Sequence, residues 1–206
     1  MRKTVLFLLL SVAVLGTSSP SNAREQAHKI EVFGSDSPER GTTRVGYWDD
    51  TKKGGTGQFA IDYGKPIWRK DYEDSAKFDA MTKGRVWRMG SNFWTVLDTD
   101  MPITIAGKSV PAGYWYLGLK RSADGASWSL AFIDPQKVKQ AQLDASEIGR
   151  APIAFEAPMT IEKASESRDK LVIDLVIDKD HIYQATLRVA WGNLQLSAPV
   201  GVQAKA

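Results

Sequence analysis

Short runs in which apolar and polar side chains alternate restrict the fold of this chain more than any other feature. A strand with one buried face sends every second side chain into the core, so a period of two predicts half-buried strands. Many such runs separated by turns, with no repeated βαβ unit, predict a mainly β fold, and we expect an antiparallel β-sandwich or, as the alternative, a barrel. The apolar positions are Phe59, Ile61 and Tyr63; Trp115, Leu117 and Leu119; Trp128, Leu130 and Phe132; Leu171, Ile173, Leu175 and Ile177; Leu187, Val189 and Trp191.

Two local signals add a hairpin and a helix to this pattern. Runs at residues 114–121 and 127–134 flank a connection that contains Asp124 and Gly125, a pair that favours a tight turn. One short helix is expected at residues 135–147, because Asp134 can cap it, Pro135 suits its first turn and Gly149 can end it.

The N-terminus has the layout of a cleaved secretory signal peptide at residues 1–23. Arg2 and Lys3 precede an apolar run of about 13 residues, and a small-residue cleavage site ends at Ala23. Such a run falls short of the ~20 residues that a membrane-spanning helix needs. We therefore expect an exported protein of the periplasm or the extracellular medium, with no membrane insertion after signal cleavage.

The rest of the chain is expected to hold one domain. Residues 24–57 are polar and rich in turn residues; we interpret them as a lead-in segment with a strand near residues 43–48 and a flexible end at residues 54–57. Residues 58–206 form the predicted β domain. Without residues 1–23 the chain has 25 Lys and Arg against 24 Asp and Glu, and this near-neutral balance argues against a nucleic-acid partner.

Several kinds of catalytic site are missing from the sequence. The chain has no cysteine and only two histidines, His28 and His181, so it has neither thiolate catalysis nor a cysteine zinc site. It contains no His-Glu-x-x-His, Gly-x-Ser-x-Gly, P-loop or dinucleotide motif. We therefore expect no metal and no cofactor.

Aromatic and basic residues concentrate in two segments, residues 63–69 and 85–94. Guanidinium groups bind carboxylate, sulfate or phosphate and stack on indoles, so this mixture predicts a site for an anionic or sugar-like small ligand. The alternative is that the tryptophans anchor the core and the arginines hold the loops together. The candidate ligand-binding residues are Tyr63, Lys65, Trp68, Arg69, Trp87, Arg88 and Asn92.

The same segments resemble a bacterial family of exported proteins, domain of unknown function 2911. The similarity covers residues 58–134 and 186–202, with Lys65, Met89 and Phe93 departing from the family's usual Arg, Thr and acidic residue. It implies an exported β domain and transfers no activity. The matching elements are Tyr63-Gly64-Lys65-Pro66, Val86-Trp87-Arg88-Met89-Gly90-Ser91-Asn92, Ile105-Ala106-Gly107-Lys108 with Pro111-Ala112-Gly113-Tyr114, and Leu187 with Trp191-Gly192-Asn193.

Three functions remain open at this level. The first is a non-catalytic ligand-binding or envelope-associated protein, which a cleft joining Arg69, Arg88 and Asn92 would favour. The second is a metal-free hydrolase of an envelope or glycan substrate, which needs two carboxylates about 5–10 Å apart in such a cleft. The third is a structural partner of another envelope protein, which a flat apolar patch would indicate.

Overall fold

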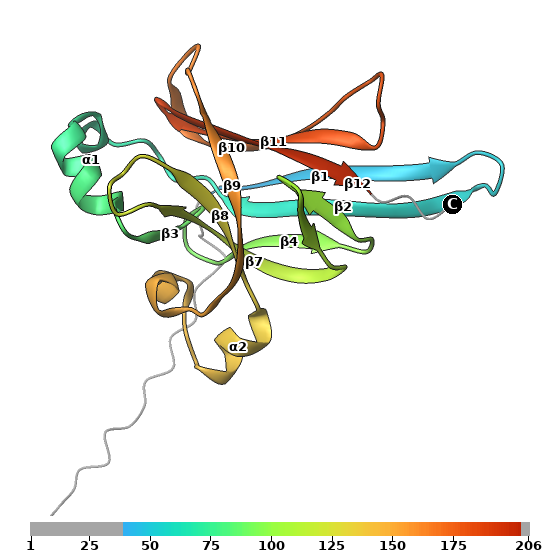
Figure 1. The fold of residues 1–206 in the computed structure, drawn as a ribbon, viewed down its shortest axis with the longest axis horizontal. Helices are drawn as coiled ribbons and strands as arrows, with labels where there is room; N and C mark the ends of the chain where they lie inside the picture. The colour runs from blue at the N-terminus through green and yellow to red at the C-terminus, as the bar shows by residue number, and fades with distance from the viewer. Residues whose placement is uncertain (1–38, 203–206) are drawn as a thin grey trace, which may run out of the picture. The chain divides into compact units, whose positions relative to one another are not determined.

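Antiparallel strands account for most of the chain in the computed structural model, which describes residues 39–202 (Figure 1). All strand pairs in its ladders are antiparallel, which confirms the predicted mainly β class. The strands are β1 (Arg40–Asp49), β2 (Gly54–Gly64), β3 (Val86–Arg88), β4 (Thr95–Thr99), β5 (Ile103–Ile105), β6 (Lys108–Val110), β7 (Gly113–Arg121), β8 (Trp128–Ile133), β9 (Ile153–Glu162), β10 (Arg168–Ile177), β11 (Gln184–Gly192) and β12 (Leu194–Val202).

The strands form a continuous path that folds over into two layers. Its order is β1-β2-β4-β7-β8-β9-β12-β11-β10, with β3 on β7 and the β5–β6 hairpin on β12. Strand β9 pairs with β8 on one side and with β12 on the other, so it joins the layers. In Figure 1, β10, β11 and β12 lie over β1, β2 and β4, which is the predicted sandwich arrangement.

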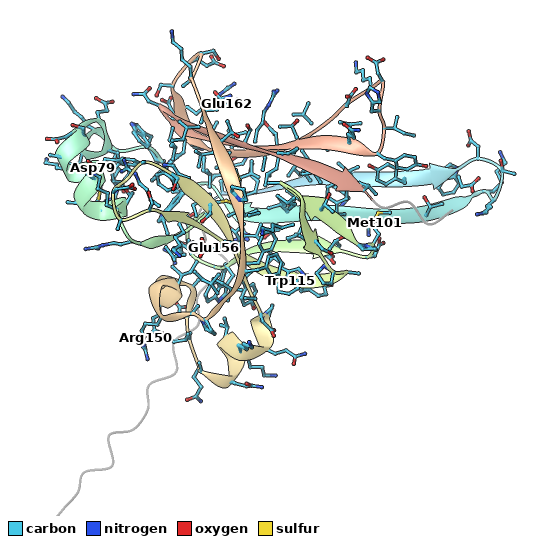
Figure 2. All side chains as sticks on the ribbon, viewed as in Figure 1. Asp79, Met101, Trp115, Arg150, Glu156 and Glu162 are labelled. Carbon is cyan, nitrogen blue, oxygen red and sulfur yellow. The ribbon has the colours of Figure 1, made fainter. Side chains whose placement is uncertain are left out.

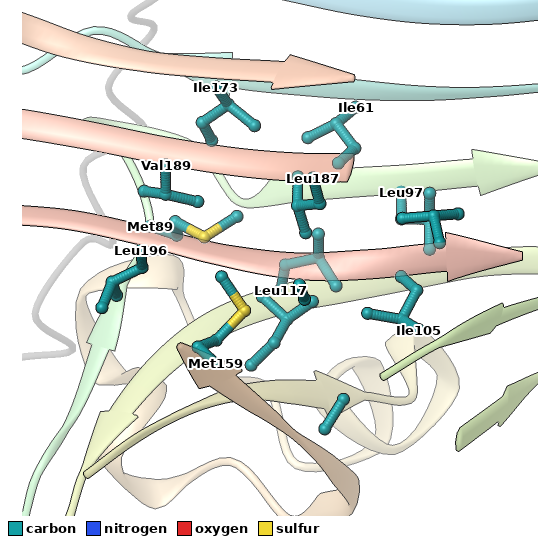
Figure 3. Packing of buried hydrophobic residues seen from close by; sticks show 14 of the residues in the cluster. Ile61, Met89, Leu97, Ile105, Leu117, Met159, Ile173, Leu187, Val189 and Leu196 are labelled. Carbon is teal, nitrogen blue, oxygen red and sulfur yellow. The ribbon is translucent and has the colours of Figure 1, made fainter. Parts of the chain in front are cut away.

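The core lies between these layers. Figure 3 shows Ile173 and Leu187 of one layer in the same cluster as Ile61 and Leu97 of the other. Most of the apolar positions that alternation assigns to the interior are buried in this cluster: Phe59, Ile61, Tyr63, Leu117, Leu119, Trp128, Leu130, Phe132, Leu171, Ile173, Leu187, Val189 and Trp191. Trp115 and Leu175 pack against the cluster but remain partly exposed.

Side chains of the first two strands of the path, β1 and β2, bind the last strand, β10. The Tyr63 hydroxyl accepts a hydrogen bond from the Ile173 backbone N–H at 3.0 Å, and Thr43 Oγ1 accepts one from Leu175 N–H at 3.1 Å. The Tyr63 ring passes over Gly41, where a side chain would collide with it. The two ends of the path are thus held together without a continuous backbone ladder.

The predicted lead-in segment is wrong in part, because the sheet begins inside residues 24–57. The strand expected near residues 43–48 is present within β1. Residues 54–57, which we expected to be flexible, are the start of β2, with Asp49 opposite Gly54 and Trp48 opposite Gly55. A turn through Lys53, whose φ is +50°, allows this pairing. The predicted signal peptide lies outside the described residues.

The helix prediction is correct in position and too long. Helix α2 (Pro135–Gln140) begins at the predicted Asp134 cap, but Gln142 adopts a left-handed φ of +52° and ends it. Asp144 then caps a separate 3₁₀ segment, η2 (Ala145–Arg150). A second 3₁₀ segment, η1 (Lys70–Glu73), precedes a helix that alternation did not reveal, α1 (Ser75–Thr82). No helix within residues 39–202 has the length and apolar character to cross a bilayer.

Candidate functional site

One cleft of the described structure gathers most of the predicted site residues. Its volume is about 720 Å³, within the usual range for small-molecule sites. Five of the seven predicted residues line it: Lys65, Arg69, Trp87, Arg88 and Asn92. We call this hollow the cationic cleft.

A crossing of the chain from one layer to the other brings these segments together. Pro66 ends the pairing of β2, and the next residues run against the start of β10. Trp68 N–H donates to Asp169 O at 2.7 Å, and Leu171 N–H donates to Pro66 O at 3.1 Å. Lys65 and Arg69 therefore lie beside Lys170, which is about 100 residues further along the sequence and also lines the cleft.

A tight contact holds the loop after β3 against the end of β2. The backbone and hydroxyl of Ser91 lie so close to Gly64 that any side chain at Gly64 would collide with them. The Gly-containing elements of residues 63–66 and 86–92 thus pack directly on one another. The close approach explains why glycine stands at position 64.

Stacked rings form the aromatic wall of the cleft. Trp87 lies parallel to Trp191, with ring centroids 4.7 Å apart and an interplanar angle of 8°. The Trp191 Nε1–H donates to Pro66 O at 2.9 Å, which fixes the orientation of the indole. Tyr72 of η1 adds a third ring, 5.0 Å from Trp191.

Positive charge dominates the lining. Four cationic side chains, Lys65, Arg69, Arg88 and Lys170, face a single carboxylate, that of Glu39. Glu39 bridges the two lysines, with Oε1 2.9 Å from Lys65 Nζ and Oε2 2.6 Å from Lys170 Nζ. These hydrogen bonds, first from Lys170 and then from Lys65, lower the pKa of Glu39 to about 2.

Arg69 and Arg88 differ in how they are held. Within residues 39–202 the Arg69 side chain has no hydrogen bond or ion pair, and the residue is exposed. Arg88 is half-buried, and its Nη1 donates to the backbone carbonyl of Asn92 at 2.8 Å. Asn92 has a φ of +62°, so this bond stabilises an unusual turn.

Strand register explains the position of Arg88. Trp87 lies opposite Leu119, which is buried in the core, whereas Arg88 lies opposite Gly118. Successive side chains of a strand point to opposite faces of the sheet, so Trp87 and Arg88 lie on different faces. Arg88 thus positions the loop that borders the cleft through its bond to Asn92, while Lys65, Arg69 and Lys170 supply the rest of the positive charge.

Two of the predicted residues do not line the cleft. Tyr63 is 4% exposed and uses its hydroxyl to bind the backbone of β10. Trp68, which we expected at the surface, packs edge-on against Trp191 at 5.0 Å and lies on the α-carbon of Gly192. For these two residues the alternative interpretation, that they anchor the structure, describes the observed contacts.

Four lining residues lie outside the two predicted segments, residues 63–69 and 85–94: Glu39, Tyr72, Lys170 and Trp191. Trp191 was assigned to the core, and it is 6% exposed and also lines the cleft. Lys170 and Glu39 stand in polar stretches without any distinguishing pattern. Only the crossing of residues 66–68 onto β10 brings them to the site.

The lining offers little for hydrolysis by paired carboxylates. Glu39 is the one carboxylate among the described lining residues, and its low pKa keeps it ionised. His181 pairs with Asp178 at an exposed turn and is not part of the lining. Across residues 39–202, no three acidic or histidine side chains gather as they do around a metal ion.

Comparison with known families gives one match. The family model described as "Protein of unknown function (DUF2911)" matches residues 49–200, about three quarters of the chain. No match is found among curated proteins or among solved structures.

Proposed function

This chain belongs to the DUF2911 family of proteins of unknown function, and we propose that it binds a small anionic or sugar-like ligand in the cationic cleft. The observation that carries the proposal is the excess of cations over carboxylates around a hollow of about 720 Å³ with an aromatic wall. Pockets for small ligands combine apolar and aromatic walls with a few polar groups that set orientation. A net positive lining favours an oxyanion such as a carboxylate or phosphate.

Within this site, Arg69 is the residue best placed to contact a ligand. Within residues 39–202 its guanidinium makes no hydrogen bond or ion pair and interacts with Asp71 only at longer range, so binding would not have to break an existing ion pair. Ser91 also lines the cleft, and its hydroxyl is buried without a hydrogen-bond partner in residues 39–202. That hydroxyl packs against Gly64 and is closed to solvent, so we assign it no ligand contact.

Titration with inorganic phosphate, glucuronate and neutral glucose tests the proposal. We expect the two anions to bind, and to bind more weakly as salt is raised, because salt screens exposed charges. Arg69→Gln should weaken phosphate binding roughly tenfold, the effect of losing one charge-assisted hydrogen bond. Isothermal titration calorimetry measures both effects.

The matched control is Arg85→Gln, which removes an exposed arginine that does not line the cleft. It should leave phosphate affinity and melting temperature unchanged. Equal affinities in the two variants, or no anion binding at all, would overturn the proposal.

We place this binding outside the cytoplasm, because the three-zone pattern of residues 1–23 is that of a secretory signal. Expression of the full chain in a bacterial host should yield a mature protein that begins at Arg24. N-terminal sequencing of the exported product checks this, and a protein that keeps Met1 and stays in the membrane fraction would contradict it.

A further inference from the structure

A second, smaller hollow adjoins the cationic cleft and has a different character. Its volume is about 100 Å³, and its walls are mainly apolar. The Thr82 hydroxyl in this lining already has a hydrogen-bond partner, because it donates to Phe78 O at 2.7 Å. The side chains that shape it include Tyr72, Phe78, Met81, Trp87, Trp128 and Trp191. We call it the apolar pocket.

The two hollows share part of their walls. Tyr72, Trp87 and Trp191 line both of them. Trp87 and Trp191 are stacked, and Trp191 is fixed by its hydrogen bond to Pro66. The boundary between a cationic and an apolar compartment is therefore a set of aromatic rings in defined positions.

Helix α1 supplies the outer wall of the apolar pocket. Phe78 and Met81 are three residues apart, so they lie on the same side of the helix. No residue of α1 is buried, and Met81 is 40% exposed. An ion pair between Asp79 and Arg121 at 2.7 Å holds the helix in place, and Figure 2 labels Asp79 on this helix.

We propose that the apolar pocket receives a short hydrocarbon or aromatic arm of the anion whose head occupies the cationic cleft. The inference rests on the proposed function and adds the class of ligand: an oxyanion with a small apolar substituent. An apolar cavity of about 150 Å³ holds a benzene molecule. The apolar pocket therefore suits a chain of a few carbons or part of a ring, and it is too small for a long acyl chain.

The cationic cleft and the apolar pocket together indicate the chemical class of the ligand. A purely polar ligand would leave the apolar pocket unoccupied. A purely apolar ligand would lie beside the cations of the cleft without offering them a negative charge. An arm in the apolar pocket would cover the exposed part of Met81, an unbranched and adaptable side chain that packs against varied shapes. The pairing of a charged compartment with an apolar one thus selects an amphiphilic anion.

A chain-length series tests this inference on the full mature protein. The phosphate series consists of inorganic phosphate and ethyl, butyl, hexyl, octyl and phenyl phosphate. A parallel carboxylate series consists of acetate, butyrate, hexanoate and phenylacetate. Affinity should rise about three- to fourfold per added methylene while the chain fills the apolar pocket, and then level off. Calorimetry gives the affinities, and shifts of the Trp87 and Trp191 indole N–H signals in NMR spectra report weak binding.

Met81→Phe separates the two compartments, because the larger ring fills the apolar pocket from an exposed position. It should remove the gain with chain length and leave inorganic phosphate binding unchanged. Ile161→Phe is the matched control at an exposed position outside both hollows, and it should keep the gain.

The possible failures are distinguishable. If neither the phosphates nor the carboxylates bind, the cationic cleft is not an anion site and both proposals fall. If phosphate binds but chain length has no effect, only the inference about the apolar pocket is overturned. A gain that persists in Met81→Phe would place the apolar arm elsewhere and would also overturn it.

Discussion

Glu39 is the residue whose replacement most directly changes the cationic cleft. Its carboxylate pairs with both Lys65 and Lys170, offsets one of their two charges and occupies the place between them that a ligand oxyanion would take. Because its pKa is lowered to about 2, this bridge is present above the ordinary glutamate pKa of 4.5 and is lost only as pH falls toward 2. The bridge therefore persists through the neutral range.

Glu39→Gln should tighten phosphate binding. Removing a unit charge a few ångströms from the ligand in a solvated site changes affinity by about fivefold. Calorimetry at pH 7 measures the change. Glu166→Gln breaks an ion pair with Arg168 away from the cleft and should have no effect; weaker binding in Glu39→Gln would mean that Glu39 organises the site instead of competing for it.

Gly192 is a second position where one side chain decides a local structure. Its φ is +56°, and the Trp68 indole occupies the space of its missing side chain. Gly192→Ala should lower the free energy of unfolding by about 2–4 kcal/mol, from the left-handed backbone and the collision together. Urea denaturation checks this, and Gly149→Ala, where nothing lies within 4 Å, should change stability much less.

At the scale of elements, α1 shows why a helix can escape sequence analysis. It has Phe78 and Met81 as its larger apolar residues and buries none of its side chains, so it shows no clear apolar face. Its attachment relies on Asp79, which pairs with Lys83 and with Arg121. Arg121 in turn lies over the rings of Phe78 and Trp128 at 5.6 Å and 5.5 Å.

Asp79→Asn should loosen α1 without unfolding the sheet. Its hydrogen bonds, first with Lys83 and then with Arg121, lower the pKa of Asp79, so the attachment is present above the ordinary pKa of 3.8 and weakens as pH falls through the lowered value. Hydrogen exchange at pH 7 should show faster exchange in residues 75–82 and unchanged protection in β8. Asp71→Asn, which breaks an exposed pair with Lys77, is the control. Unchanged exchange in both variants would show that ring packing alone holds α1.

At the scale of the molecule, contacts of β1 and β2 with β10, the last strand of the path, hold the two layers together. Tyr63 is central to this closure, because its buried hydroxyl accepts the Ile173 backbone N–H from the other layer. Tyr63→Phe leaves that N–H without its acceptor and should lower the free energy of unfolding by about 1–3 kcal/mol. Chemical denaturation measures the loss. Tyr114→Phe, at a residue that is 65% exposed, should change stability by less than about 0.5 kcal/mol; a similarly small loss in Tyr63→Phe would mean that this bond contributes little to closure.

The sequence by itself determined several strands, among them β2, β10 and β11, the hairpin of β7 and β8, and most of the core, because period-two alternation records which face of a strand is buried. It also singled out Lys65, Arg69, Trp87, Arg88 and Asn92, since basic and aromatic residues cluster locally in the chain. The tertiary structure alone decided that Glu39, Lys170 and Trp191 join them, and that Tyr63 and Trp68 turn inward. The physical reason is that the cleft forms where residues 66–68 cross onto β10, a contact between segments about 100 residues apart that no local pattern encodes.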